Sequence, residues 1–298
     1  MENISVVLFW IALVFYLLGA VGYFFYFAFR QNAVGTVGTI MAVIGVAAHL
    51  GSIATRWIAA GHSPIANMYE YTSLLAVLLM VSYLIVEFFT KSKVFGGLAT
   101  GAAFLFMGLA RLFYAEPTPL MPALKSYWLD IHVFTMVISS GILGVGFIFA
   151  LLYVLKQRTE DRARPQVARS AKERPAMAGG ATATYEGHSS GFLGRLPAAD
   201  VLDHLSYRTT AFGFPLWTLG VIAGAIWAEQ AWGRYWGWDP KETWSLITWL
   251  VYAGYLHARV TAGWRGRPAA WLSALGFAAL LFTFYAVNLW ISGLHSYA

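Results

Sequence analysis

Long apolar runs constrain the fold of this chain more than any other feature. A transmembrane helix needs about 20 mostly apolar residues, because the hydrocarbon core of a bilayer is about 30 Å thick. Eight runs come close to this length or exceed it, at about residues 4–29, 37–55, 69–89, 94–113, 130–155, 209–230, 243–259 and 269–291. Only 11% of the residues are charged, against about 25% in soluble domains. The sequence therefore predicts an all-α, polytopic membrane protein with about eight transmembrane helices, and it excludes a soluble enzyme and a β-barrel, whose strands alternate apolar and polar residues.

Composition and small residues add two further constraints. The chain has no cysteine, so its own thiols cannot form disulfides or bind metal. The net charge of +6 does not indicate nucleic-acid binding, because the basic residues are confined to particular loops. The spacings Gly97–Gly101 and Gly220–Gly224 predict close approach of neighbouring helices.

The distribution of basic residues predicts the orientation of the chain in the membrane. Fifteen of the 20 Lys and Arg residues fall in one set of loops and five in the opposite set. Since Lys and Arg favour cytoplasmic loops, both termini are predicted to be extracytoplasmic. Nine of the fifteen lie in the basic, Ala- and Gly-rich segment 157–208 and at its border residue Lys156. We predict that 157–208 is a cytoplasmic, largely disordered loop within a single transmembrane domain, 1–298.

Tryptophan is concentrated in one outward-facing segment, residues 229–246, which we call the tryptophan-rich loop. Trp232, Trp236 and Trp238 crowd together there, and Asp239 and Lys241 follow. One interpretation is an aromatic belt at the membrane interface, where tryptophan is common. The alternative is a flat aromatic platform for a large planar ligand with acidic substituents, such as a porphyrin. Its propionates would then contact Arg234 or Lys241.

Two histidines are predicted to lie at the same face as the tryptophan-rich loop. His132 lies at the outer end of the fifth run, and His295 follows the eighth. Two imidazoles can ligate a haem iron from both sides. Taken alone, each histidine is better explained as a packed, hydrogen-bonded residue, but together with the tryptophans between them the two favour haem ligation.

The other histidines differ in depth. His257 lies about 21 Å below the outer end of the seventh run, at 1.5 Å per residue, so it cannot share an iron with the outer pair. His49, its one intrachain candidate partner, is mismatched in depth. We interpret His49 and His62 as structural or loop residues and assign no role to His204.

The sequence resembles a known family at these same residues. WGRYWGWD, residues 232–239, is similar to the WWD motif of the haem-handling membrane proteins of cytochrome c maturation. LSYRTTAFGFPLWTLG before it, PKETWSLITWLVYAGYLHAR after it and SPIANMYEYTSLL near residue 63 resemble the CcsA (ResC) branch. The resemblance covers most of the chain and leaves out the basic segment.

The resemblance implies roles for individual residues. His132 and His295 would ligate haem iron at an outer site, and His257 would ligate a transmembrane haem. The haem platform would comprise Trp232, Gly233, Trp236, Gly237, Trp238 and Asp239. The second transmembrane ligand would come from a separate CcsB (ResB) partner, because this chain has no such portion.

The function implied is that of the haem-binding, haem-exporting subunit of a System II cytochrome c synthase. It would move haem b outward and present it for thioether attachment to the CXXCH motif of apocytochrome c. Synthase activity would require the CcsB partner, and the host would be a bacterial plasma membrane rather than a thylakoid. Two alternatives stay open: a haem transporter of CcmC type without synthase activity, and a haem-b electron-transfer subunit of a respiratory complex.

Overall fold

The computed structural model describes residues 1–172 and 192–294, which form helices and connecting loops without any strand. The long helices are α1 (Glu2–Phe29), α2 (Asn32–Ala60), α3 (Met68–Thr90), α4 (Gly96–Leu112), α5 (Tyr127–Lys172), α6 (Ala199–Trp232), α7 (Pro240–Thr261) and α8 (Arg267–Leu281). A π-helical segment, Phe282–Ala286, joins α8 to α9 (Val287–Trp290). Short 3-10 turns occur at Pro122–Leu124 and Phe192–Arg195. The predicted all-α class is confirmed.

Each of the eight predicted spans coincides with a helix, the eighth with the continuous run from α8 to α9. Six of these helices are long and apolar enough to cross a membrane, judged by length and composition. Of the other two, α4 is apolar but has 17 residues, and α7 is long enough but less apolar. Helix also occupies both ends of the predicted loop 157–208, because α5 continues to Lys172 and α6 begins at Ala199. The middle of that loop, 173–191, lies outside the described residues.

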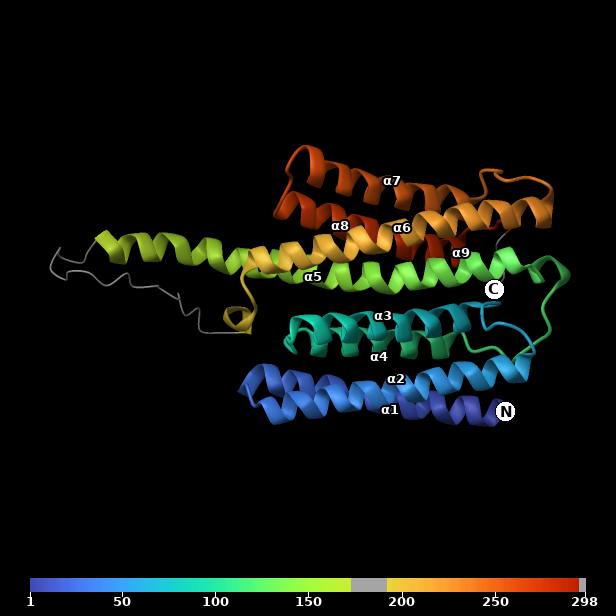
Figure 1. The fold of residues 1–298 in the computed structure, drawn as a ribbon, viewed down its shortest axis with the longest axis horizontal. Helices are drawn as coiled ribbons and strands as arrows, with labels where there is room; N and C mark the ends of the chain where they lie inside the picture. Colours follow the sequence, from blue (N-terminus) through green and yellow to red (C-terminus); the bar gives the residue numbers. More distant parts are fainter. Residues whose placement is uncertain (173–191, 295–298) are drawn as a thin grey trace.

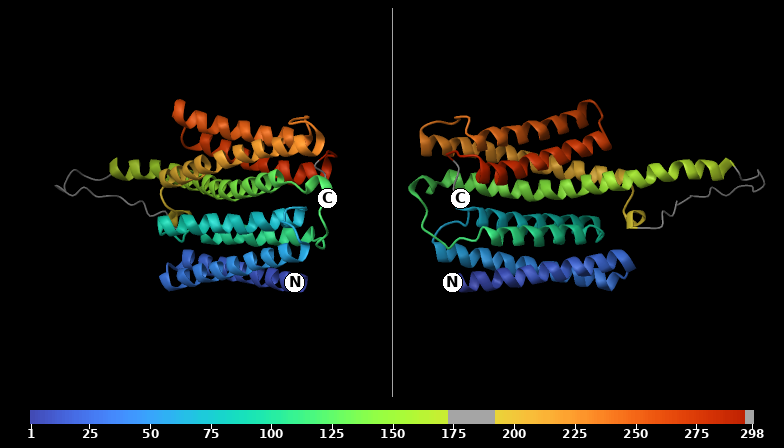
Figure 2. Two further views of the ribbon diagram at one scale, coloured as in Figure 1. Left: turned by 45° about the vertical axis from the view of Figure 1, so that its right-hand side comes forward. Right: turned by 180° about the vertical axis from the view of Figure 1, so that it is seen from behind.

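The long helices form four antiparallel hairpins stacked side by side (Figures 1 and 2). The hairpin α1–α2 packs through α1 on α4, α3 packs on α5, and α8 packs on α5. Glycines permit the closest approaches: a Cβ at Gly22 would lie 3.0 Å from the Cα of Gly38 on α2. Gly97 packs against Phe24, and Gly220 and Gly224 pack against α5, whereas Gly101 has open space around it. The predicted close packing is therefore wrong at Gly101 and correct at the other three.

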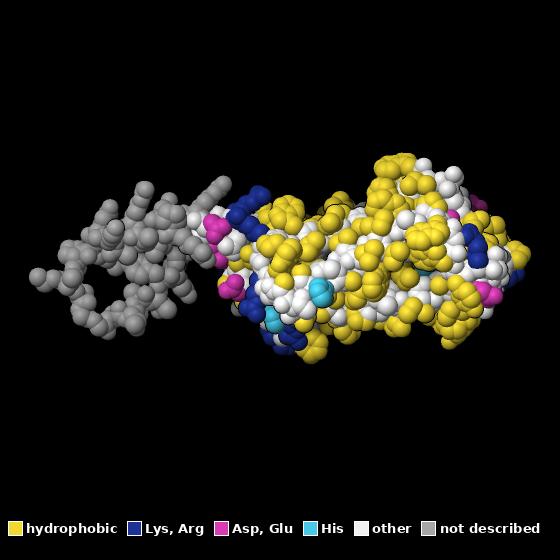
Figure 3. Space-filling model, turned by 90° about the horizontal axis from the view of Figure 1, so that it is seen from above, with side chains coloured by type: hydrophobic (Ala, Val, Ile, Leu, Met, Phe, Trp, Pro, Cys, Tyr) yellow, Lys and Arg dark blue, Asp and Glu magenta, His cyan; other side chains and the backbone are white. Residues whose placement is uncertain are grey.

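The loops gather at two ends of the bundle, and the N-terminus and the end of α9 lie at the same one (Figure 1). Hydrophobic side chains cover the middle of the face drawn in Figure 3, and charged side chains lie toward its ends. This distribution suits a protein that crosses a bilayer. We call the end that holds the N-terminus and the tryptophan-rich loop the tryptophan end.

Candidate functional site

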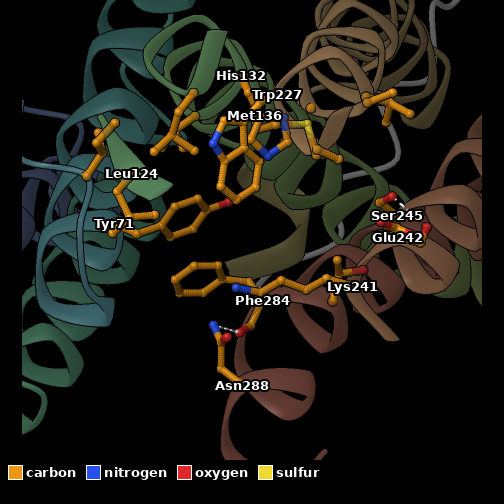
Figure 4. Close-up of a pocket in the computed structure, with 18 of the residues that line it drawn as sticks. Tyr71, Leu124, His132, Met136, Trp227, Lys241, Glu242, Ser245, Phe284 and Asn288 are labelled. Carbon is orange, nitrogen blue, oxygen red and sulfur yellow. Dashed lines mark hydrogen bonds between the residues drawn. The ribbon is translucent and has the colours of Figure 1, made fainter. Parts of the chain in front are cut away.

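A cavity lies near the tryptophan end, between α3, α5, α6, α7 and the segment Phe282–Ala286 (Figure 4). Its volume is about 150 Å³. Its wall is mainly apolar and aromatic, and a few polar side chains converge on it, including His132, Lys241, Glu242 and Asn288. An apolar pocket with few, converging polar groups is typical of a small-molecule site.

His132 reaches the cavity from the first turns of α5, and its ring is held by α6. The Nδ1 atom lies 2.7 Å from the backbone oxygen of Gly220. A carbonyl oxygen only accepts, so Nδ1 carries the proton and Nε2 carries the lone pair. Metal-binding histidines are commonly fixed in this way, with one ring nitrogen donating to a carbonyl. Gly224 allows the close approach, because a Cβ there would lie 2.6 Å from Nδ1.

Aromatic rings line the cavity opposite and below His132. The rings of Tyr71 on α3 and Phe284 are stacked, with centroids 3.5 Å apart and planes 15° from parallel. Phe284 belongs to the π-helical segment, a distortion often found at functional sites. Trp227 on α6 lies nearly parallel to the His132 ring at 6.4 Å. Met136 lies one turn below His132 (Figure 4).

The tryptophan-rich loop is shaped by its backbone. Gly233 ends α6 with a φ of 70°, and Trp238 has a φ of 58°, which is uncommon for a residue with a side chain. Pro240 occupies the first turn of α7, and Asp239 caps that helix. Asp239 and Glu242 form a capping box: the Asp239 side chain accepts a hydrogen bond from the backbone nitrogen of Glu242, and the Glu242 side chain accepts one from the backbone nitrogen of Asp239. Helix thus takes both ends of the range 229–246, and the irregular part comprises residues 233–239.

The three tryptophans of the motif have different environments. Trp236 lines the cavity. Trp232 packs against Trp227, with ring centroids 4.8 Å apart, and Trp238 is 70% exposed. The rings of Trp236 and Trp238 stand at 88° to each other. The loop therefore presents separate ring faces and edges rather than one flat surface, and a role as a haem platform stays a prediction.

Asp239 connects the loop to the C-terminal segment. Its carboxylate is buried, and Oδ2 accepts a hydrogen bond from the backbone nitrogen of Leu294 at 2.7 Å. Gly293 fits closely at this contact, since a Cβ there would lie 2.6 Å from the same oxygen. Leu294 is the last described residue, so His295 lies outside the described residues. The part of the chain that leads to His295 is nevertheless fixed to the tryptophan-rich loop.

Of the two basic residues predicted to contact the propionates, one lines the cavity and the other does not. Lys241 lines the cavity, and its Nζ lies 5.8 Å from the centre of the Phe284 ring. Burial lowers the pKa of Lys241 to about 8, although Asp239 acts in the opposite direction. Arg234 does not belong to the described lining of the cavity. Its guanidinium lies against Gly237, at the position where a Cβ would be.

The other four described histidines do not line this cavity. His257 is exposed on α7. His49 is fully buried, with Nε2 2.8 Å from Ser73 Oγ and Nδ1 3.4 Å from the Tyr16 hydroxyl, as suits a structural residue. His62 joins two loops through the carbonyl oxygens of Ser63 and Thr118. His204 is exposed near the start of α6.

Sequence reasoning assigned no role to the segment before α3, which also lines the cavity. Ala66 and Asn67 are held there by Glu70, whose Oε2 accepts from the Ala66 nitrogen at 2.7 Å. Glu70 is in turn paired with Arg56 at 2.7 Å, and both side chains are buried. The sequence signal was the similarity of residues 63–75 to the family, which carried no role for these residues.

Comparisons with known proteins show what this chain is similar to. A family model described as "Cytochrome C assembly protein" matches residues 65–295. The protein "Cytochrome c biogenesis protein CcsA" of Gloeothece citriformis is 40% identical, over all of this chain and 96% of the relative. The protein of the same description from Guillardia theta is 38% identical, over 99% of this chain and 92% of the relative.

A solved structure has a similar fold. The structure "Cytochrome c Heme Lyase CcmF" superposes with a TM-score of 0.65 at 18% sequence identity. The superposition covers 95% of this chain and 46% of that structure, so this chain spans about half the length of that protein.

Proposed function

Since this chain belongs to the cytochrome c assembly protein family, we propose that it is the haem-binding and haem-exporting subunit of a cytochrome c synthase. It moves haem b to the outer face of the membrane and presents it there for thioether attachment to the CXXCH motif of apocytochrome c. The observation that carries this proposal is the geometry of His132. Its ring lines an aromatic cavity, and the Gly220 carbonyl fixes it with the proton on Nδ1, the tautomer in which Nε2 is the iron-ligating nitrogen.

The cavity suggests how haem is held. At about 150 Å³ it is smaller than the roughly 300–1,000 Å³ of most ligand pockets. A porphyrin therefore inserts one edge and rests its remaining surface on the tryptophan-rich loop, where Tyr235 and Trp238 are 61% and 70% exposed. Trp236 contacts the ring, and the Lys241 ammonium pairs with a propionate. Arg234 serves the second propionate at the outer rim.

The second axial ligand of the outer haem is His295. The hydrogen bond from Leu294 to Asp239 supports this assignment, because it holds the preceding residue at the tryptophan-rich loop. Bis-histidine ligation stabilises the iron until the histidine of the apocytochrome replaces one ligand. The protein thus supplies position and ligation, and the thiols and vinyl groups supply the bond-forming chemistry.

His257 belongs to a second, transmembrane haem site that a CcsB-type partner completes. Its exposure on α7 supports this assignment, because a histidine on an outer helix face is accessible to another membrane protein. Haem enters through this site from the cytoplasmic half and leaves it toward the outer cavity. The complex lies in a bacterial plasma membrane, with the tryptophan end outward.

Replacing the axial ligands tests this function. The purified complex with its partner should contain low-spin haem, and His132→Gly or His295→Gly should lose most of it or leave it open to oxidation. Added imidazole should restore the low-spin spectrum in part, because it fills the vacated position. The measurements are the haem content per protein and the reduced absorption spectrum.

His204→Gly is the matched control, because that histidine is exposed and remote from the cavity. It should leave both measurements unchanged. If His132→Gly and His295→Gly both keep the normal reduced low-spin spectrum, haem is not ligated at this site. If haem is bound normally but the wild-type complex never forms thioethers, the protein delivers haem without attaching it.

A further inference from the structure

Glu242 has a carboxylate oxygen that the fold itself does not use. The residue is 9% exposed and lines the cavity from the first turn of α7. Its Oε2 accepts two backbone hydrogen bonds, from the nitrogen of Gly237 at 2.7 Å and from that of Asp239 at 3.1 Å. Its Oε1 is buried and has no hydrogen-bond partner among the described residues. A buried acceptor without a partner is costly, so its retention calls for an explanation.

Helix capping alone does not require this second oxygen. The N3 position of a capping box accepts Gln as readily as Glu, because one side-chain oxygen satisfies the backbone donors. The two bonds to Oε2 also fix the carboxylate, so Oε1 keeps a set position. Oε1 is therefore a preformed, buried acceptor in a residue that lines the cavity proposed for haem.

The chemistry of the substrates decides which of them this atom recognises. Ionised haem propionates carry only acceptors and are repelled by a carboxylate, so they belong near Lys241. A cysteine thiol is a hydrogen-bond donor, and the apocytochrome brings its thiols to the vinyl groups. Lys241 and Glu242 are adjacent in the chain, and both line the cavity. Lys241 thus suits a haem propionate, and Glu242 suits the thiol of the apocytochrome.

We propose that Glu242 is a catalytic residue, which binds the apocytochrome thiol through Oε1 and transfers its proton during thioether formation; this rests on the proposed function. The S–H bond breaks and its proton passes to Oε1. Glu242 delivers this proton to the outer vinyl carbon, which bonds it with the π electrons of the double bond. The thiolate sulfur bonds to the inner vinyl carbon, whose developing positive charge the porphyrin ring delocalises. The carbon–carbon double bond is consumed, nothing is oxidised or reduced, and the carboxylate is regenerated.

The substitution Glu242→Gln isolates this role. The Gln oxygen can keep both backbone bonds, while its amide group removes the acceptor at the position of Oε1. With haem-loaded complex and a CXXCH peptide, thioether formation should fall about 10²- to 10⁴-fold, the usual range for a lost acid–base group. Haem content and the reduced spectrum should stay within about twofold of the wild type. Glu242→Asp, which withdraws the carboxylate by one methylene, should give an intermediate rate.

Glu116→Gln is the matched control, because Glu116 is exposed after the end of α4 and does not line the cavity. It should react at the wild-type rate. Normal thioether formation by Glu242→Gln, at normal haem content, overturns the proposal and leaves the proposed function intact. A wild-type complex that binds no haem overturns the proposed function instead. If Glu242→Gln accumulates poorly, Glu242→Asp decides, and a wild-type rate in that variant again overturns the proposal.

Discussion

The imidazole of His132 occupies the space that a side chain at position 224 would need. A Cβ on Gly224 would lie 2.6 Å from Nδ1 and 2.7 Å from Cε1, well inside van der Waals contact. Gly224→Ala should therefore displace the ring, break its bond to the Gly220 carbonyl and weaken haem binding about 10- to 100-fold, as happens when a metal-ligating histidine loses its hydrogen-bond partner. Haem titration of the purified variant measures this effect.

Gly101→Ala provides the comparison for that variant, because nothing lies within 4 Å of a Cβ at Gly101. Alanine there should leave haem affinity unchanged and raise stability by roughly 0.5–1 kcal/mol, the helix preference of Ala over Gly. Equal haem affinity in Gly224→Ala and the wild type would show that α6 does not set the position of His132.

Lys241 makes haem affinity dependent on pH. Burial lowers its pKa from 10.5 to about 8, so in the haem-free protein the ammonium is lost as the pH rises through about 8. Because only the ammonium pairs with a propionate, affinity should be flat below pH 8 and fall by up to about tenfold per unit above it. Lys241→Arg, which stays charged, should abolish this fall, and Lys241→Met should bind weakly throughout. Haem titrations from pH 6.5 to 9.5 measure the affinity of each variant. Identical pH profiles for Lys241→Met and the wild type would contradict a role of Lys241 in haem binding.

At the scale of elements, α7 is polar on the side that faces the protein. All four of its buried residues carry a polar group: Glu242, Thr248, Tyr252 and Tyr255. They recur at helical spacing, and apolar side chains such as Leu250 and Val260 lie on the exposed side. These polar groups contribute to the lower apolar content of α7, which packs on α8 and α6 at the edge of the bundle (Figure 1).

Two substitutions on this face should have different effects on stability. Thr248 Oγ1 lies 3.2 Å from Thr283 Oγ1, whereas the Tyr252 hydroxyl is buried without a partner among the described residues. Thr248→Val should cost about 1 kcal/mol for the lost hydrogen bond, and Tyr252→Phe should be neutral or stabilising. Thermal unfolding in detergent compares them. A larger loss in Tyr252→Phe would indicate an internal water bound at that hydroxyl.

At the scale of the whole molecule, both described chain ends and the tryptophan-rich loop lie at one end of the bundle (Figure 1). The excess of basic residues in the opposite loops predicts that the tryptophan end faces outward. A reporter inserted at Gly180 should therefore be active in the cytoplasm, and one fused after Ala298 should be active outside. The reverse result would place the cavity on the cytoplasmic side and contradict haem export.

Apolar runs were sufficient to predict the helices, because lipid exposure requires such runs whatever the tertiary structure. The extension of α5 to Lys172 was missed, although Arg, Ala, Gln and Glu in that stretch are good helix formers. The π-helical segment at Phe282 was not predictable, since it depends on packing rather than on periodicity.

Those residues of the candidate site that are uncommon in membrane-spanning segments could be predicted from the sequence. His132, Trp236 and Lys241 stand out in the sequence and meet at the cavity. Tyr71, Met136 and Phe284 do not stand out, because an apolar residue reads the same whether it faces lipid or a cavity. The hydrogen bond from Leu294 to Asp239 joins residues 55 positions apart, so no local sequence pattern predicts it.

The tryptophans in the cavity wall give the protein an optical signal of its own. Trp217, Trp227 and Trp236 all line the space proposed for the porphyrin. Indole fluorescence is quenched by a nearby porphyrin, whose intense violet absorption overlaps the indole emission. Haem binding in the cavity should lower the tryptophan fluorescence. Transfer of haem to an apocytochrome should raise the fluorescence again as the porphyrin leaves. The timing of loading and release can thus be followed in unlabelled protein.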